Sequence, residues 1–191
     1  MKSKSSIRKE NLKLRLSLSS KKEKQAEIDL LKIWNKFQLK NQLKLNKVGV
    51  YWPINKELST LSIINNLFEK QCRCYLPVLS SKKERIMTFR NYDTQSKMMK
   101  NNFGIYEPLN GEHVKIDFLD LIILPLVAFD KLGYRIGMGK GYYDTALKHY
   151  NKLTTCLIGI GYDFQEQENC FPEDHDILLE AVLTPSRIIR F

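Results

Sequence analysis

An uninterrupted apolar run in the second half of the chain is the strongest constraint on the fold. Residues 121–124 read Leu-Ile-Ile-Leu and are followed by Pro125. A strand buried on both faces reads in this way, whereas a half-exposed strand alternates apolar and polar residues. A second such strand is expected at residues 154–160, and residues 142–150 between the two suit a helix. Strand, helix and strand over this length form a βαβ unit, which predicts parallel strands with a right-handed crossover.

Further elements extend this unit into an α/β domain. Apolar residues recur at helical spacing over residues 24–40, and residues 61–68 form another helix that Ser59 or Thr60 can cap. The other strand candidates are residues 48–52, 72–79 and 86–89. We predict a single domain over residues 1–191, with a mostly parallel sheet sandwiched between helices in three layers. Ligands of such sheets bind at the carboxyl ends of the strands.

Two segments leave alternatives open. Leucines alternate over residues 12–18, which by period suggests a strand, but the abundance of Lys and Leu without Gly or Pro favours a helix. We predict a helix there. Residues 91–111 are polar and irregular, and they contain Gly104 and Pro108. This segment is either a loop that covers a substrate or a surface connection, and composition does not decide between them.

The positive charge of the chain is confined to its N-terminal quarter. Residues 1–47 carry 14 Lys and Arg against 4 Asp and Glu, and the remaining residues carry 17 of each. This predicts a basic, helical N-terminal region within the domain. A basic arm attracts nucleic acid, an anionic membrane surface or a polyanionic small molecule, and it can equally be a solvated helix face.

Cysteine usage and hydropathy indicate a cytoplasmic protein. The four cysteines form no C-x-x-C pair, the three histidines have no zinc-ligand spacing with them, and Cys72 and Cys74 lie in an apolar stretch as expected for buried thiols. The longest nearly uncharged apolar run, residues 121–129, is far short of the ~20 residues of a membrane helix. No signal peptide is expected, although the basic, Ser-rich residues 1–20 leave an organellar transit peptide as an alternative.

A glycine-rich stretch, residues 135–144, carries the clearest chemical signal. Its sequence is RIGMGKGYYD, with alternating glycines at Gly137, Gly139 and Gly141. Glycines leave backbone amides unshielded and permit positive φ angles. Successive exposed amides form an anion-binding nest, and the positive end of the following helix adds to it. The stretch therefore predicts a phosphate site, with a ligand-free turn as the alternative.

Charged residues within this stretch fit phosphate chemistry. Arg135 and Lys140 would neutralise phosphate oxygens, and Asp144 is a carboxylate that can hold magnesium beside them. The spacing matches neither the Walker A loop nor the dinucleotide-binding G-x-G-x-x-G.

Four motifs in the same order resemble the 5-formyltetrahydrofolate cyclo-ligase family, also called methenyltetrahydrofolate synthetases. The resemblance covers nearly the whole chain. It is carried by KSSIR at residues 4–8, YWPINKELST at 51–60, LP, FD and G at 124–133 followed by RIGMGKGYYD at 135–144, and PEDHD with LTP at 172–185. It implies an enzyme that converts 5-formyltetrahydrofolate and ATP into 5,10-methenyltetrahydrofolate, ADP and phosphate, with Mg²⁺.

The resemblance also implies roles for individual residues. The catalytic residues are Lys140, Tyr143 and Arg135. The ATP-binding residues are Lys4, Arg8, Arg135, Gly137, Gly139, Lys140, Gly141, Tyr142 and Tyr143. The substrate-binding residues are Trp52, Glu57, Gly139, Lys140 and Tyr142. The magnesium ligands are Asp144 and Asp176.

Some of these assignments have structural alternatives. Glu57 could be a charge at a helix entry, Asp176 a solvated loop carboxylate and Trp52 a core residue. Met138 departs from the family pattern, where this position is often basic or glycine, and we expect altered nucleotide affinity rather than lost activity.

The expected partners are small molecules, namely ATP and a folate with a polyglutamate tail, and neither nucleic acid nor membrane. We expect a monomer, with a dimer as the alternative. Two rival functions stay open. One is a nucleic-acid-binding module that uses residues 1–47, and the other is an α/β enzyme of similar architecture that needs no ATP.

Overall fold

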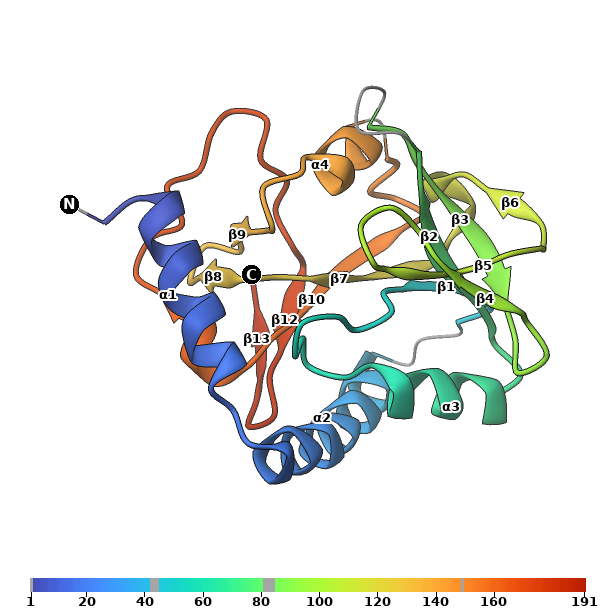
Figure 1. Cartoon of the computed structure of the whole chain (residues 1–191), viewed down its shortest axis with the longest axis horizontal. Coiled ribbons are helices and arrows are strands. Elements are labelled where there is room, and N and C mark those ends of the chain that lie inside the picture. The colour runs from blue at the N-terminus through green and yellow to red at the C-terminus, as the bar shows by residue number, and fades with distance from the viewer. Residues whose placement is uncertain (1, 42–44, 81–84, 149) are drawn as a thin grey trace.

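A computed structural model describes residues 2–41, 45–80, 85–148 and 150–191 of the chain. A large sheet crosses the molecule (Figure 1), and its strands are, in spatial order, β13 (Ile188–Arg190), β12 (Ala181–Leu183), β10 (Cys156–Ile160), β7 (Leu121–Pro125), β1 (Lys47–Val50), β2 (Arg73–Leu79), β3 (Met87–Tyr92) and β6 (His113–Val114). The strands from β12 to β2 are parallel, and antiparallel strands complete both edges. The mostly parallel sheet is thus confirmed.

Helices cover both faces of this sheet. They are α1 (Lys4–Leu16), α2 (Ser20–Asn41), α3 (Leu61–Glu69) and α4 (Tyr142–Leu147), with short 3₁₀ turns η1 (Ile116–Phe118) and η2 (Asp163–Gln165). Figure 1 shows α2 and α3 below the sheet and α4 above it, which gives the three predicted layers. Among the described residues, none of the helices combines the length and the hydropathy that crossing a membrane requires.

The strand at residues 121–125 is buried on both faces, as its apolar run predicts. Leu121 and Ile123 belong to the core under α2 and α3, whereas Ile122 and Leu124 belong to the core under α4. All four side chains are fully buried. Since successive side chains of a strand point to opposite faces, only a continuous apolar run can serve both cores.

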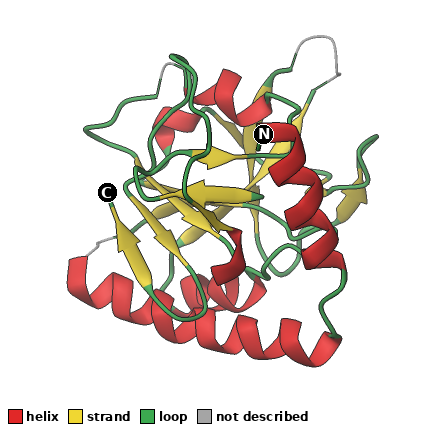
Figure 2. Cartoon of the chain, turned by 90° about the vertical axis from the view of Figure 1, so that its left-hand side faces the viewer, coloured by secondary structure: helices red, strands yellow, loops and turns green. Residues whose placement is uncertain are grey.

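The first helix begins at the N label in Figure 2 and lies beside a small second sheet, part of which is labelled in Figure 1. That sheet consists of β11 (Glu166–Gln167), β8 (Ala128–Asp130) and β9 (Arg135–Ile136). The buried face of α1 is formed by Ile7, Asn11 and Arg15, and the Asn11 side chain donates a 3.0 Å hydrogen bond to the carbonyl of Val127. The alternating leucines are thus in or next to a helix, as predicted, but they do not form its buried face: Leu14 and Leu16 are exposed.

Three elements differ in detail from the sequence-based expectation. The helix expected over residues 142–150 ends at Leu147, and His149 lies outside the described residues. Thr60 is at the N-cap of α3, but its hydroxyl donates to the carbonyl of Tyr51. The other predicted candidate, Ser59, accepts a 3.3 Å hydrogen bond from the amide of Leu61, the first residue of the helix. The irregular segment 91–111 contains a hairpin of β4 (Met98–Lys100) and β5 (Tyr106–Pro108).

The strand order places a crevice in the middle of the sheet. From β1 the chain continues to β2 and β3 on one side, whereas β7 pairs with the other side of β1 and leads to β10 and β12. The connections after β1 and β7 therefore diverge at their carboxyl ends, with α3 on one face and α4 on the other. Open α/β sheets bind ligands at such a switch point.

Candidate active site

A cavity of about 500 Å³ opens at this switch point. Its walls come from the segments that follow β1 and β7, the end of β2 and the glycine-rich stretch, so it lies at the carboxyl ends of neighbouring strands. The structure brings every residue that the sequence singled out for a site into its lining: Lys4, Arg8, Trp52, Glu57, Arg135, Gly137, Gly139, Lys140, Gly141, Tyr142, Tyr143, Asp144 and Asp176.

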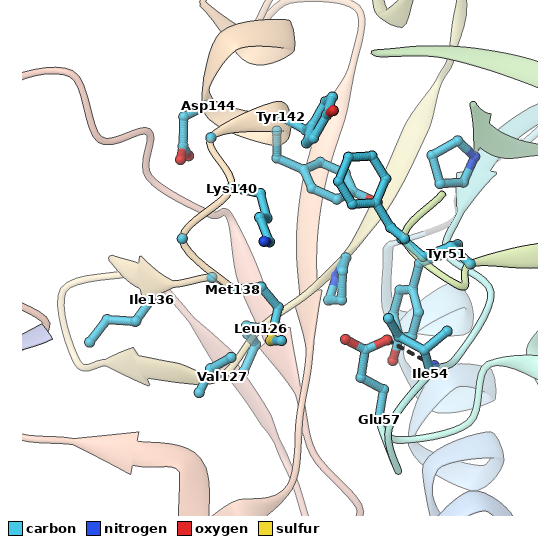
Figure 3. A pocket seen from close by; sticks show the side chains of 18 of the residues that line it. Tyr51, Ile54, Glu57, Leu126, Val127, Ile136, Met138, Lys140, Tyr142 and Asp144 are labelled. Carbon is cyan, nitrogen blue, oxygen red and sulfur yellow. Dashed lines mark hydrogen bonds between the residues drawn. The ribbon is translucent and has the colours of Figure 1, made fainter. Parts of the chain in front are cut away.

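The glycine-rich stretch forms one wall of the cavity. Gly139 and Gly141 have φ angles of 78° and 75°, in the left-handed region that favours glycine, whereas Gly137 does not. A Cβ atom on Gly139 would lie 3.3 Å from the guanidinium carbon of Arg8. Figure 3 shows the Lys140 side chain reaching into the cavity from this wall, opposite Glu57. The bare backbone at Gly139 thus allows the Arg8 guanidinium to approach closely, which a side chain at this position would obstruct.

Two basic residues reach this wall from α1. Ser3 caps the helix, because its hydroxyl accepts a hydrogen bond from the amide of Ser6. One turn later, Arg8 Nε donates a 2.8 Å hydrogen bond to the carbonyl of Gly137. Lys4 Nζ lies 2.8 Å from a carboxylate oxygen of Glu173 and 2.8 Å from one of Asp176. The N-terminal segment therefore closes one side of the cavity.

Arg135 and Asp144 form an ion pair at the wall. Arg135 Nη2 lies 2.5 Å from Asp144 Oδ1, and Arg135 Nη1 donates to the carbonyl of Ile177 at 3.0 Å. The guanidinium is almost fully buried, while the Asp144 side chain is 40% exposed. Because α4 has only six residues, its dipole adds less to an anion site than the expected longer helix would. The charge of this wall comes mainly from its cationic side chains.

The two tyrosines that follow the glycines differ in their environment. Tyr142 is buried, packs edge-on against the ring of Phe103 and donates its hydroxyl to the carbonyl of Ser80 at 3.0 Å. The hydroxyl of Tyr143 is also buried, but it has no hydrogen-bond partner among the described residues. Burial, and then the nearby Glu57 charge, raise the pKa of the Tyr143 phenol, so it stays a hydrogen-bond donor. Its donor is therefore available to a bound molecule.

Glu57 occupies the opposite wall, on a turn with unusual backbone angles. Asn55 and Lys56 have φ angles of 46° and 57°, and the Glu57 amide donates to the Ile54 carbonyl at 2.8 Å. Two such residues in succession are typical of a type I′ turn. The amide of Ile54 in turn donates to Glu57 Oε2 at 3.1 Å (Figure 3). Burial raises the pKa of Glu57 to about 7, although the charge of Arg15 and the Ile54 amide lower it.

Trp52 is both a core residue and a cavity residue. It is half-buried and packs against the core under α2 and α3. Its ring lies 5.7 Å from that of Tyr92 and 6.3 Å from that of Tyr106, centroid to centroid. An aromatic wall of this kind can hold a planar ligand by stacking.

The carboxylates of the cavity fit a magnesium ion shared with phosphate groups. Asp144 and Asp176 both face the cavity, among the cations of Lys4, Arg8 and Arg135. In the described ranges, no group of three or more His, Cys, Asp and Glu side chains could enclose a metal alone. Mg²⁺ needs no such cage, because it is usually held by one or two carboxylates, phosphate oxygens and water.

Sequence reasoning missed several parts of the site. Phe103 and Ile105 line the cavity, so the segment 91–111 contributes to it, and a substrate-covering role for this segment stays a prediction. No motif marks them. Arg15 was also missed: it is buried behind Glu57, and Nη1 lies 3.9 Å from Glu57 Oε1. Its signal is the helical spacing of Ile7, Asn11 and Arg15, which identifies the buried face of α1.

Comparison with known proteins decides the family. The model of the 5-formyltetrahydrofolate cyclo-ligase family matches residues 1–185. The chain belongs to this family. The 5-formyltetrahydrofolate cyclo-ligase of Haemophilus influenzae is 34% identical over 179 residues, which cover 93% of this chain and 95% of that protein. The Escherichia coli K12 protein of the same name is 39% identical over 143 residues, or 74% and 79% of the two chains.

Solved structures agree with this cyclo-ligase assignment. The 5,10-methenyltetrahydrofolate synthetase of Aquifex aeolicus superposes with a TM-score of 0.83 at 30% identity, over 98% of this chain and 92% of that one. A Mycoplasma pneumoniae synthetase has the same fold, with a TM-score of 0.78 at 23% identity, over 95% and 98% of the two chains. The cyclo-ligase family is enzymatic, so the cavity is the candidate active site of a folate-related ligase.

Proposed function

We propose that the chain catalyses the ATP- and Mg²⁺-dependent conversion of 5-formyltetrahydrofolate into 5,10-methenyltetrahydrofolate, with release of ADP and phosphate. One observation carries this proposal beyond the family: residues from four distant motifs meet in a single cavity. Its cations and two aspartates lie around the bare glycine backbone on one wall, and Glu57 lies on the opposite wall (Figure 3). Such a cavity suits a phosphorylated and a planar heterocyclic ligand bound side by side.

The reaction must overcome the low reactivity of an amide-like formyl group. Transfer of the terminal phosphoryl group of ATP to the formyl oxygen turns that oxygen into part of a good leaving group. N10 of the folate then attacks the formyl carbon, loses its proton, and phosphate departs as the ring closes. Phosphoryl transfer depends mainly on positioning and charge neutralisation, and ring closure on proximity, so the protein needs no covalent intermediate of its own.

The glycine-rich wall would bind the phosphate groups. Its backbone approaches Arg8 closely, and Lys140 and Arg135 flank it. Cations in a partly dry cavity stabilise charge on transferring phosphate oxygens more strongly than they would in water. The hydroxyl of Tyr143, which has no partner among the described residues, would donate to a reacting oxygen.

The opposite wall would bind the folate. A carboxylate at Glu57 can accept hydrogen bonds from the amino-pyrimidine edge of the pterin, and Trp52 offers a surface for its ring. Glu57 is held on a defined turn, where the Ile54 amide donates to its carboxylate. This arrangement would place the formyl group near Lys140 and Tyr143.

Asp144 and Asp176 would hold the magnesium ion. An ion held there would supply positive charge to neutralise the phosphate oxygens during transfer. Asp144 accepts a hydrogen bond from Arg135, and Asp176 accepts one from Lys4. These contacts keep both carboxylates in place at the wall.

The basic N-terminal region fits the same proposal. Lys4 and Arg8 face the cavity, so part of the positive charge would attract ATP and a polyglutamylated folate. We propose a cytoplasmic, monomeric enzyme that acts on these small molecules and needs no nucleic acid.

A turnover assay tests the proposed function. Purified protein is mixed with 5-formyltetrahydrofolate, Mg²⁺ and ATP, and the ultraviolet absorbance of the methenyl product is followed. We expect product only when ATP is present, and sharply reduced rates in Lys140→Ala and Asp144→Ala. Lys131→Ala, an exposed lysine outside the cavity lining, serves as the control and should keep the wild-type rate. Product without ATP, or full activity in both site variants, would contradict the proposal.

A further inference from the structure

A buried arginine behind the folate wall has no role in the proposed reaction so far. Arg15 is 1% exposed, although arginine is rarely buried without partners. None of its three side-chain nitrogens has a hydrogen-bond partner among the described residues. A buried cation without hydrogen bonds is costly, and such a group marks either a strained or a functional position.

The group that Arg15 faces is the carboxylate of Glu57. Arg15 Nη1 and Glu57 Oε1 are 3.9 Å apart, too far for a hydrogen bond but near enough for strong attraction in a dry interior. The other oxygen, Oε2, accepts the hydrogen bond from the Ile54 amide. The two oxygens thus have different partners, and this fixes the direction in which the carboxylate presents its free lone pairs.

The turn that carries Glu57 is tied to the same end of α1. Lys56 Nζ donates to the carbonyl of Leu18 at 2.5 Å and lies 3.1 Å from Glu23 Oε1 on α2. The α1–α2 corner therefore holds the strained turn on one side, while Arg15 faces the carboxylate on the other. Both contacts come from outside the cavity lining, so they shape the folate wall without touching a ligand.

The other ionisable groups around Glu57 cannot replace this cation. Tyr51 follows β1, and its hydroxyl donates to the carbonyl of Leu58. Tyr143 belongs to α4, and Tyr162, before η2, donates to the carbonyl of Lys56. Burial raises the pKa of each phenol, so all three are neutral at physiological pH. The charge of Arg135 lowers the pKa of Tyr143, but its guanidinium is already paired with the Asp144 carboxylate and so does not replace Arg15 beside Glu57.

We propose that Arg15 is a positioning residue for folate binding: its guanidinium keeps the buried Glu57 carboxylate ionised and aimed at the cavity, where it accepts hydrogen bonds from the pterin. The inference rests on the proposed function, in which Glu57 binds the folate. As the folate excludes water from the cavity, the attraction between the two charges grows, and a small movement closes the 3.9 Å gap to a charge-assisted hydrogen bond.

Binding of 5-formyltetrahydrofolate without ATP tests this role, measured by calorimetry from pH 6 to 9. In Arg15→Met the loss of affinity at acid pH should begin about one pH unit higher than in the wild type. That corresponds to a dissociation constant raised about fivefold at pH 7 and restored near pH 9. Arg15→Lys, which keeps the charge, should retain the wild-type profile. Lys13→Met removes an exposed charge from the same helix and should change nothing.

A second measurement separates this inference from the proposed function. Carboxyl carbon NMR of the ligand-free protein reports the titration of Glu57 directly, whether or not folate binds. Its midpoint should be higher in Arg15→Met than in the wild type, and Arg15→Gln gives the same comparison if Arg15→Met does not fold. An unchanged midpoint, or a loss of folate affinity that is equal at every pH, would overturn the inference. Wild-type protein that binds no folate would instead contradict the proposed function.

Discussion

Lys4 Nζ lies 2.8 Å from Asp176 Oδ2 and so joins residues 172 positions apart at the cavity wall. Burial raises the pKa of Asp176, but the hydrogen bond and charge of Lys4 outweigh this and hold it below its ordinary value. The carboxylate is therefore ionised at neutral pH, as its proposed role as a magnesium ligand requires. The contact also fixes the N-terminal helix next to the proposed phosphate site.

The basic residues of α1 should matter for ATP and little for stability. In the double variant Lys4→Ala/Arg8→Ala we expect the KM for ATP to rise about tenfold, which corresponds to one or two lost charge-assisted hydrogen bonds. Partly exposed ion pairs contribute less than about 1 kcal/mol each, so the Tm should change little. Steady-state kinetics and thermal unfolding measure both. Lys9→Ala is the exposed control, and an unchanged KM in the double variant would count against the assignment.

A methyl group at Gly139 should disturb the phosphate wall. Gly139→Ala forces an L-residue to a φ of 78° and places its Cβ against Arg8, whereas Gly104→Ala imposes nearly the same φ, 76°, with no atom within 4 Å. Both should lose about 1–2 kcal/mol of unfolding free energy from backbone strain. Only Gly139→Ala should also raise the KM for ATP, by several-fold. Equal KM values in the two variants would refute the proposed contact.

The predictions from sequence are confirmed where a local pattern is compatible with only one kind of structure. The run at residues 121–124 can only serve two cores, so its place in the middle of the sheet follows from its composition. The glycine-rich stretch likewise has few other uses, and its residues lie in the cavity with those of the other motifs.

The expectations fail where distant contacts decide. Thr60 has the right residue type for a cap, yet its hydroxyl is taken by the Tyr51 carbonyl from another segment. The leucines of α1 are apolar but point outward, because a face with Asn11 and Arg15 meets buried acceptors and a buried charge. A polar residue on a buried helix face cannot be recognised until its partner is known. The roles of the site residues stay proposals for a similar reason, since a position in the cavity does not identify a ligand.

Removal of the Tyr143 hydroxyl should separate stability from activity. The hydroxyls of Tyr143 and Tyr75 are both buried without a partner among the described residues, but only Tyr143 lines the cavity. Removing an unsatisfied hydroxyl costs nothing or stabilises by up to about 1 kcal/mol, so neither Tyr143→Phe nor Tyr75→Phe should lower the Tm. Turnover should fall at least tenfold in Tyr143→Phe alone. A wild-type rate in that variant would remove Tyr143 from the proposed mechanism.

The titration of Glu57 should appear in the pH dependence of stability. Its pKa rises from an ordinary 4.5 to about 7 on folding, so the folded state holds this proton more tightly. The resulting stabilisation is complete below pH 4.5 and is lost as the pH rises through 7, by about 3 kcal/mol. Glu57→Gln lacks this loss. In urea unfolding from pH 4 to 8, the unfolding free energy of the variant should therefore rise relative to that of the wild type by about 3 kcal/mol. If the two unfolding free energies changed in parallel with pH, this would contradict the burial of an ionisable Glu57.

In the proposed function, one cavity holds the ATP phosphates and the folate together. A crystal structure of the protein with 5-formyltetrahydrofolate, Mg²⁺ and a non-hydrolysable ATP analogue would show where each ligand binds. We expect the triphosphate against the backbone of residues 137–141 and Lys140, and the pterin against Glu57. A nucleotide bound elsewhere, with this cavity unfilled, would contradict the account.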